Sequence, residues 1–407
     1  MSIETSPSRH ADDCVVEASG KPAGLAANIA PPTSSPGISV IICTRDRAES
    51  LRLTLGLLVQ DDRTGLNVDV VVVDNGSRDD TRAVALSFTP QLPIRYLYEP
   101  RPGKANGQNR VIDEGGLRDI VAILDDDISP RPGWFHAVAA MATRLPGYDY
   151  FSGSLEIDWP ACDIPAWAHD PRLASWAFSV LRLDGEEDQP IRTGWFPCGG
   201  YVWYRRRVFD DGRRFRPLWA CEPCFALDLQ ASGYKGMWSP SVRAGHRVQR
   251  TLLSKRTISE RAVIWSRSKA RIQLAHGPES AKGTPQSRLL SLSRFRRSLS
   301  AARALFRWVA VCLKRYPSAD ARFLSLLHAR GEVAAAVERI RIRSAIDRSP
   351  RAPSVWHLLL TSLIRGCCAI VHSQMGRVGP RHDRSICIRG GQQSVYPSAH
   401  TISRLAN

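Results

Sequence analysis

The sequence predicts an α/β fold in which a mostly parallel sheet is flanked by helices. Short apolar, β-branched runs alternate with longer segments whose apolar residues recur at helical spacing, which is typical of βαβ units. The runs are largely apolar, and the run at 68–74 is almost wholly so, as expected for strands that are covered on both faces of a parallel sheet. The chain has 407 residues, of which 43% are hydrophobic, enough for a substantial core.

The elements follow from this alternation in chain order. The first four strands are predicted at 38–44, 68–74, 94–98 and 120–124, with helices between them at 47–60, 79–88 and 103–114. Beyond the fourth strand, the pattern predicts helices at 132–144, 205–210 and 222–233, and extended segments at 149–155, 200–204, 235–238 and 242–246. The stretch 158–196 is irregular and rich in tryptophan, which would either face sugar rings or fill the core.

The flanking regions differ in composition from this α/β part, which we assign to residues 37–250. Residues 1–36 are rich in Ala, Ser and Pro and are predicted to be a disordered leader. Because they contain no apolar run, we expect no secretory signal and a cytoplasmic location. Basic helical segments at 251–275, 288–315 and 319–345 define a region over 251–375, and 376–407 is predicted to be a disordered tail.

The net charge of +17 is concentrated at one end of the chain. Residues 1–280 contain 34 basic and 34 acidic residues, whereas residues 281–407 contain 22 basic and 5 acidic ones. No RNA-binding aromatic motif accompanies the basic residues, so we do not expect nucleic acid as a partner. Arg mixed with Leu, Phe and Trp suits a helix on an anionic membrane surface, so 281–375 is predicted to meet the inner face of the plasma membrane. The alternative is a solvated helix packed on the catalytic domain.

Three acidic residues, Asp125, Asp126 and Asp127, directly follow the fourth predicted strand. Adjacent carboxylates repel one another, so a divalent cation is a natural counter-charge, although acids also favour helix starts. Alternation along an extended backbone would let Asp125 and Asp127 address one ligand while Asp126 points elsewhere. In parallel sheets, ligands bind at the carboxyl ends of the strands, which favours a functional role.

Two other strand ends carry polar residues. Asp74 ends the second strand before a tight turn, and a carboxylate there can accept a hydrogen bond from a nucleobase or ribose, although the segment is also ordinary turn chemistry. Thr44, Arg45 and Asp46 follow the first strand in the same way. Three strand ends with polar groups therefore converge on one edge of the predicted sheet.

The ordered set of motifs resembles the family 2 glycosyltransferases, which have the GT-A fold and use nucleotide sugars. The acidic triplet is similar to the DxD motif of that family, with the Pro130 and Gly133-Trp134 that usually follow it. The resemblance covers about residues 38–275. The other matching motifs lie at 38–47, 70–77, 99–110, 197–200 and 205–209.

The resemblance implies roles for the residues at these positions. It implies a site for a divalent cation, Mg²⁺ or Mn²⁺, formed by Asp125, Asp127 and His246. It implies acceptor-side positions at Gly199 and Gly200. It implies contacts with the donor nucleotide from Thr44, Arg45, Asp46, Asp74, Lys104, Asp125 and Asp126.

The family's register also implies the catalytic base. The family places an acidic pair at a helix start, eleven residues before the Gly-Tyr that stands here at 233–234. Glu222 therefore matches the catalytic acid of the pair, while Cys221 replaces its partner. Asp228 is the alternative base. Because no second cysteine pair follows at metal-binding spacing, we interpret Cys221-x-x-Cys224 as coincidence and not as a zinc or redox motif.

We therefore expect an inverting, metal-assisted hexosyltransferase. It would move a sugar from a nucleotide-sugar donor, a UDP-sugar in the first instance, to a glycan or lipid-linked acceptor in bacterial cell-surface polysaccharide synthesis. The cation would stabilise the leaving diphosphate, and Glu222 would accept the proton of the acceptor hydroxyl. Two alternatives stay open: a nucleotidyltransferase, although residues 44–47 lack the glycines that class requires, and a catalytically degenerate partner in a membrane-associated assembly.

Overall fold

A computed structural model of the chain describes residues 35–276 and 301–346, except 181, 182, 184, 198 and 218–220. The described residues belong to one compact unit that begins at Ser35. The predictions for the leader, for the tail and for most of 281–375 lie outside the described residues. The boundaries at 37, 250 and 375 stay predictions.

A nine-stranded sheet forms the centre of the fold, in the order β3-β2-β1-β4-β8-β6-β9-β5, with β7 paired to β9. Its first part is parallel, with β2 and β4 on either side of β1 and β3 beside β2. The four strands lie where the sequence predicts them; β1, β2 and β4 are almost wholly buried, and β3, at the edge of the sheet, is half-buried. These strands are β1 (Ile38–Thr44), β2 (Val68–Asp74), β3 (Ile94–Tyr98) and β4 (Ile120–Leu124).

The second part of the sheet is mixed, which refines the expectation of a mostly parallel sheet. Strand β8 (Tyr201–Arg205) runs antiparallel to both β4 and β6, so its first residues lie beside the carboxyl end of β4. The segments predicted at 235–238 and 242–246 form one long strand, β9 (Gly236–Arg247). The remaining strands are β5 (Ile128–Pro130), β6 (Tyr150–Asp158) and β7 (Gln189–Pro190).

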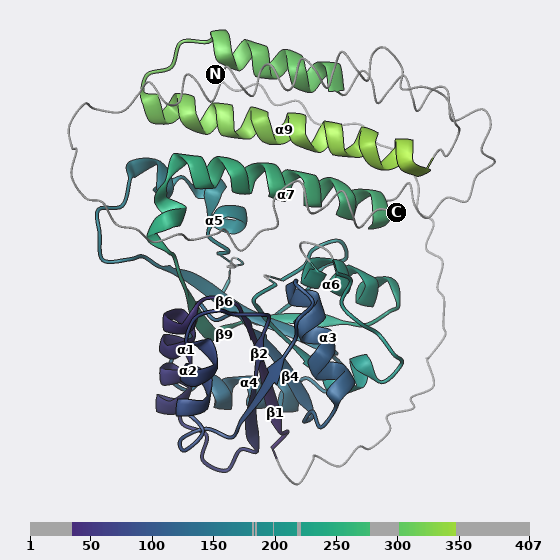
Figure 1. Cartoon of the computed structure of the whole chain (residues 1–407). Helices are drawn as coiled ribbons and strands as arrows, with labels where there is room; N and C mark the ends of the chain where they lie inside the picture. Colours follow the sequence, from purple (N-terminus) through teal and green to yellow (C-terminus); the bar gives the residue numbers. More distant parts are fainter. Residues whose placement is uncertain are drawn as a thin grey trace, which may run out of the picture. The chain divides into compact units, whose positions relative to one another are not determined.

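Helices cover both faces of the sheet, as Figure 1 shows with α1 and α2 on one side and α3 on the other. This arrangement follows from the chain order. Helices α1 and α2 connect β1 to β2 and β2 to β3, toward one edge of the sheet, whereas α3 connects β3 to β4 on the other side of β1. The helices of this part are α1 (Ala48–Gln60), α2 (Thr81–Ser87), α3 (Lys104–Glu114), α4 (Trp134–Arg144), α5 (Pro171–Ala177) and α6 (Cys221–Ala231). Short 3₁₀ helices are η1 (Ala166–His169), η2 (Arg206–Phe209) and η3 (Arg250–Leu253).

The basic C-terminal segment forms helices that pack beside the sheet domain. Helix α7 (Lys255–His276) lies along α9 (Ala319–Ile346), and a further helix covers 301–313. A second apolar cluster joins α7 and α9 to the tryptophan-rich stretch; it contains Trp167, Phe178, Val248, Ile258 and Phe323. Trp167 is 4% exposed, so this tryptophan fills the core. None of the helices in the described part of the chain has the length and apolar character needed to cross a bilayer.

Candidate active site

Polar residues meet where β1, β2 and β4 end and β8 begins. Thr44 and Asp74 are register partners at the ends of β1 and β2. The backbone N–H of Asp125 donates to the carbonyl of Gly200 at 3.0 Å, which joins the acidic turn after β4 to the loop before β8. The antiparallel pairing of β8 with β4 therefore brings two segments that are distant in sequence to the predicted edge of the sheet.

Lys104 connects two carboxylates at this edge. Its ammonium group, on the first turn of α3, pairs with Asp125 and lies 2.6 Å from Oε1 of Glu222. It also donates to the carbonyl of Gly199 at 3.3 Å. Burial alone would raise the pKa of Glu222, but the ammonium group outweighs it and holds that pKa below its usual range. For Asp125, burial prevails and its pKa is raised.

Glu222 is held from two further sides. It lies in the first turn of α6 and is 6% exposed. The amide nitrogen of Gln108 donates to Oε1 at 2.8 Å, and the thiol of Cys221 lies 3.0 Å from Oε2. Gln108 is fully buried and stands one helical turn after Lys104, so one face of α3 supplies both contacts. The cysteine that replaces the family's second acid therefore serves as a hydrogen-bond partner of Glu222.

The two glycines before β8 allow these carboxylates to approach the loop. A Cβ atom at Gly199 would lie 2.8 Å from Oε2 of Glu222, and one at Gly200 would overlap the carboxylate of Asp125. Real Cβ atoms do not make such close contacts, so any larger residue at either position would have to displace the neighbouring carboxylate. The resemblance implies an acceptor-side role for both glycines. In the structure, Gly199 lies against Glu222 and Gly200 against Asp125, so the lack of a side chain lets both carboxylates approach this loop.

Asp126 points into the protein. It is 2% exposed, accepts from the hydroxyl of Thr44 at 2.6 Å and pairs with Arg47 at 3.0 Å. Burial raises the pKa of Asp126 to about 7. The expected alternation along an extended backbone is not observed, because the chain turns at 126–127: Asp126 and Asp127 share Arg47, while Asp125 pairs with Lys104. The side chains of Thr44 and Asp126 are both buried and hydrogen bonded to each other, and the donor contacts expected of these two residues stay a prediction.

Asp127 shares Arg47 with Asp126 and also contacts His246. Its Oδ2 is 2.7 Å from a nitrogen of Arg47 and 3.5 Å from Nε2 of His246. Burial opposes ionisation, but His246 and Arg47 hold the pKa of Asp127 well below its usual range. Burial likewise opposes the charged form of His246, and Asp127 nevertheless raises its pKa. Nδ1 of His246 is 2.7 Å from the carbonyl of Phe178, which orients the ring.

The expected three-residue metal set is divided between two places. Asp127 and His246 are together, whereas Asp125 pairs with Lys104 on the other side. In the described part of the chain, no three His, Cys, Asp or Glu side chains are grouped so that they could hold a metal ion. The donor chemistry of Asp127 and His246 nevertheless fits a divalent cation. The Phe178 carbonyl holds Nδ1, so Nε2 is the nitrogen left for a metal next to a carboxylate oxygen.

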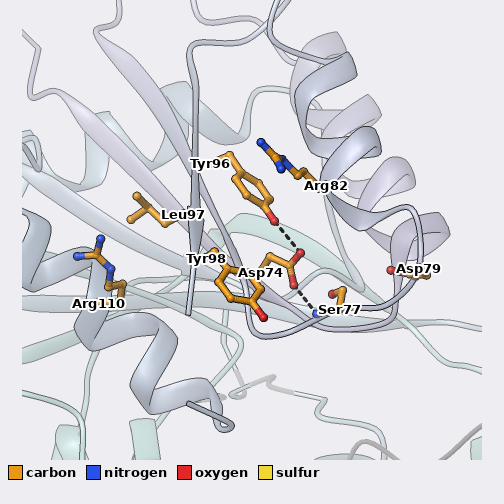
Figure 2. Close-up of a pocket in the computed structure, with 8 residues that line it drawn as sticks. All are labelled: Asp74, Ser77, Asp79, Arg82, Tyr96, Leu97, Tyr98 and Arg110. Carbon is orange, nitrogen blue, oxygen red and sulfur yellow. Dashed lines mark hydrogen bonds between the residues drawn. The ribbon is translucent and has the colours of Figure 1, made fainter. Parts of the chain in front are cut away.

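Asp74 lies in a separate open pocket of about 690 Å³ at the end of β2. Figure 2 shows its carboxylate between the hydroxyl of Tyr96, which donates at 2.7 Å, and the backbone N–H of Ser77, also at 2.7 Å. Arg82 and Arg110 contribute positive charge to the lining. Aromatic rings, a carboxylate and two guanidinium groups in one pocket suit a ligand with a flat base and an anionic part.

Arg45 and Asp46 lie in the exposed loop after β1, next to the turn that follows β2. Asp46 has a φ of +50°, and its carboxylate accepts from the backbone N–H of Arg78 at 2.7 Å. Its own N–H donates to the hydroxyl of Ser77 at 3.0 Å. Because Ser77 also lines the pocket of Asp74, this loop borders that pocket, and the nucleotide-contact prediction for Arg45 and Asp46 stays a prediction.

Sequence reasoning missed several residues of the site. Gln108 stands four positions after Lys104, and that spacing was the available signal. Arg247 follows His246 directly. Its guanidinium group donates to the backbone carbonyl of Asp126 at 2.7 Å and so stabilises the backbone of the acidic turn. Tyr96 is one of several aromatic residues in its strand, and nothing in the sequence marks it as the partner of Asp74.

Carboxylates, a glycine loop and an open pocket gather at the strand ends of this α/β sheet, which is where the active sites of such folds lie. Residues 39–213, which supply most of this sheet edge, match the sequence model of glycosyl transferase family 2. The family assignment drawn from the motifs is therefore confirmed, and so is the α/β fold class.

Individual relatives match parts of the chain. A hyaluronan synthase of Pasteurella multocida is 34% identical over 109 residues, which are 26% of this chain and 11% of that protein. A glycosyltransferase of Haloferax volcanii is 29% identical over 196 residues, 44% of this chain and 62% of the relative. The chain thus spans less than two thirds of either relative.

A solved mannosyltransferase from Pyrobaculum calidifontis, in complex with GDP-mannose and Mn²⁺, shares 17% identity with the chain. Its TM-score is 0.43, over 85% of this chain and 83% of that one.

Proposed function

We propose that the chain is an inverting glycosyltransferase that moves a hexose from a nucleotide sugar, in the first instance a UDP-sugar, to a hydroxyl of a glycan or a lipid-linked acceptor. The observation that carries the proposal is the position of Glu222. This ionised carboxylate is buried at the sheet edge of a family 2 domain, 2.6 Å from Lys104, next to the acidic turn and the glycine loop.

Glu222 is the proposed general base. Inversion in one step requires a base that removes the proton of the attacking hydroxyl as the bond to the anomeric carbon forms. Gln108 and Cys221 fix the orientation of the carboxylate, and Lys104 keeps it ionised in the resting enzyme. A positioned base of this kind contributes about 10² to 10⁴ to the rate.

The donor nucleotide is proposed to bind in the pocket of Asp74. Its carboxylate can accept from the N–H of a base, and Tyr98, 54% exposed, presents an aromatic face in the same pocket. Asp127 and His246 are the residues that would hold a divalent cation, Mg²⁺ or Mn²⁺, which would act as a Lewis acid on the diphosphate. Lys104, which pairs with Asp125, and Arg47, which pairs with Asp127, add positive charge at the acidic turn.

The biological setting is proposed to be bacterial cell-surface polysaccharide synthesis at the inner face of the plasma membrane. The matching synthases of hyaluronan and chondroitin in Pasteurella multocida support a polysaccharide role. The basic C-terminal segment supports contact with an anionic surface.

The test is the release of nucleoside diphosphate from a panel of UDP- and GDP-sugars, with and without Mn²⁺, by the full chain. We expect turnover with at least one donor, stimulated by the metal and lost in Asp127→Ala. Turnover that is unchanged in Asp127→Ala would contradict the assignment of the cation to that residue. Release of pyrophosphate from a nucleoside triphosphate would favour the nucleotidyltransferase. Donor binding without turnover for every sugar would favour the degenerate assembly partner.

A further inference from the structure

The helix over 301–313 exposes a continuous apolar face. Phe306 is 75% exposed, Val309 40% and Leu313 80%, and these are three of the six large hydrophobic residues that are exposed in the described part of the chain. They stand three and four positions apart, so they share one side of the helix. Ala302 and Ala310 lie on the same side and are exposed too.

Cations border this apolar face on one side. Arg303, Arg307 and Lys314 are exposed and follow at the spacing that places them beside Phe306. The sequence 301–318 contains no acidic residue. Arg307 lies 3.2 Å from Glu332 of α9, so its side chain is held at the flank of the helix. An apolar stripe with a basic border and no acid is the pattern of a helix that lies in a membrane interface.

The opposite side of the helix is anchored to the rest of the protein. Ala301 and Ala304 are 5% and 8% exposed and pack with Ala336 of α9, with Val333 and Ile340 at the edges of the cluster. Small side chains at this contact let the two helices approach closely. The helix is drawn in green beside α9 in Figure 1. Because Ala301 and Ala304 pack against α9, the exposed apolar residues lie on the side of the helix that is turned away from α9.

We propose that the outward face of 301–313, formed by Phe306, Val309 and Leu313 with its border of cations, docks on an anionic lipid surface. Two observations select lipid as the occupant. The segment 281–407 has 22 basic and 5 acidic residues, so a second copy would bring like charges together. An anionic bilayer satisfies both parts of the face, because its acyl boundary takes the apolar side chains and its headgroups take the cations.

This inference deepens the proposed function, since it names the surface on which a lipid-linked acceptor would be met. It is tested with the full chain by sedimentation with vesicles of phosphatidylcholine alone and of phosphatidylcholine and phosphatidylglycerol in equal amounts. We expect binding to the mixed vesicles and not to the neutral ones. The double variant Phe306→Ser/Leu313→Ser should weaken binding to the mixed vesicles by about tenfold or more, because it removes the two largest apolar side chains that the bilayer would bury.

The matched control is Leu53→Ser/Leu86→Ser, which removes two leucines of 49% and 44% exposure from α1 and α2. It should bind the mixed vesicles like the unmodified chain, and both double variants should keep their thermal unfolding temperature, since all four side chains are exposed. Equal binding by Phe306→Ser/Leu313→Ser and the unmodified chain, or equal binding to neutral and anionic vesicles, would overturn the proposal. A dimer in gel filtration that Phe306→Ser/Leu313→Ser dissociates would assign the face to a second copy. Nucleoside diphosphate release by the same preparations reports on the transferase activity separately.

Discussion

The sheet edge and the helix over 301–313 use charge in opposite ways. At the sheet edge, Asp125, Asp127 and Glu222 are buried or half-buried and each contacts a cationic side chain. On the helix, cations are exposed beside apolar side chains, with no acid in the segment. Buried charges interact strongly and depend on their partners, whereas exposed charges are screened and act nearly independently. Single substitutions should therefore have large effects at the first region and small ones at the second.

The largest expected effect is that of Glu222→Gln. The amide keeps the size and some hydrogen bonds of the side chain but cannot accept the proton of the acceptor hydroxyl. We expect the rate of transfer to fall by about 10² to 10⁴, the usual contribution of a general base. Donor binding, measured by calorimetry, should persist, because Glu222 lies away from the pocket of Asp74.

Asp228→Asn is the matched control for this experiment. Asp228 lies in the same helix but pairs with Arg216 at 2.8 Å, outside the carboxylate group at the sheet edge. Its substitution should leave transfer within a factor of about two, since exposed ion pairs contribute little. A large loss in Asp228→Asn together with near-normal transfer in Glu222→Gln would move the base to Asp228.

Gly200→Ala should reduce transfer by about 10², because the added methyl group would displace the Asp125 carboxylate and small misplacements at a reacting centre are costly. Gly147→Ala is the control, since a Cβ there meets no atom within 4 Å. Steady-state kinetics of both variants compare a glycine that borders the site with one that does not. Equal activities would show that the glycine loop has no steric role.

Lys104→Met should change the pH dependence of the reaction. The ammonium group holds the pKa of Glu222 down against burial, and a general base works only above its pKa. The acidic limb of kcat/KM should therefore lie below the usual range of a glutamate in the unmodified chain and move to higher pH in Lys104→Met. Lys104→Arg keeps the charge and should keep the limb near its original place. If the acidic limb of kcat/KM stays in place in Lys104→Met, the titrating group that this limb reports is not Glu222.

The smallest expected effect is that of a single cation on the outer helix. Arg303→Gln should weaken binding to anionic vesicles by about fivefold, the contribution of one basic residue near an anionic surface, and added salt should reduce the difference. Arg52→Gln, which removes an exposed arginine from α1, should leave vesicle binding unchanged. Equal effects of the two substitutions would mean that vesicle binding depends on the net charge of the chain and not on this helix.

Most of the sheet was predictable because its central strands β1, β2 and β4 are buried and therefore largely apolar. The exception is β9, which the sequence presents as two pieces because Ser239, Pro240 and Ser241 interrupt the apolar pattern. In the fold, the register between β6 and β9 shifts after Gly153, which absorbs the interruption. The glycine is needed there, because a Cβ would overlap the carbonyl of Val242.

The candidate site was predictable only where a motif marks it. Asp74 and Asp125 could be predicted as site residues because each stands at the carboxyl end of a predicted strand, where ligands bind in such sheets. That prediction requires no knowledge of tertiary contacts. Gln108 could not be assigned a role in the same way, because its partner Glu222 lies 114 positions further along the chain. The division of Asp125 from Asp127 also depends on side-chain partners, Lys104 and Arg47, which the triplet alone does not specify.

The most direct test of the account is a crossed measurement on two variants of the full chain. Nucleoside diphosphate release with a soluble acceptor and binding to anionic vesicles are both measured for Glu222→Gln and for Phe306→Ser/Leu313→Ser. We predict that Glu222→Gln loses transfer and keeps vesicle binding, and that Phe306→Ser/Leu313→Ser keeps transfer and loses vesicle binding. Loss of both properties in either variant, or no loss of transfer in Glu222→Gln, would contradict the division of chemistry and membrane contact between the two regions.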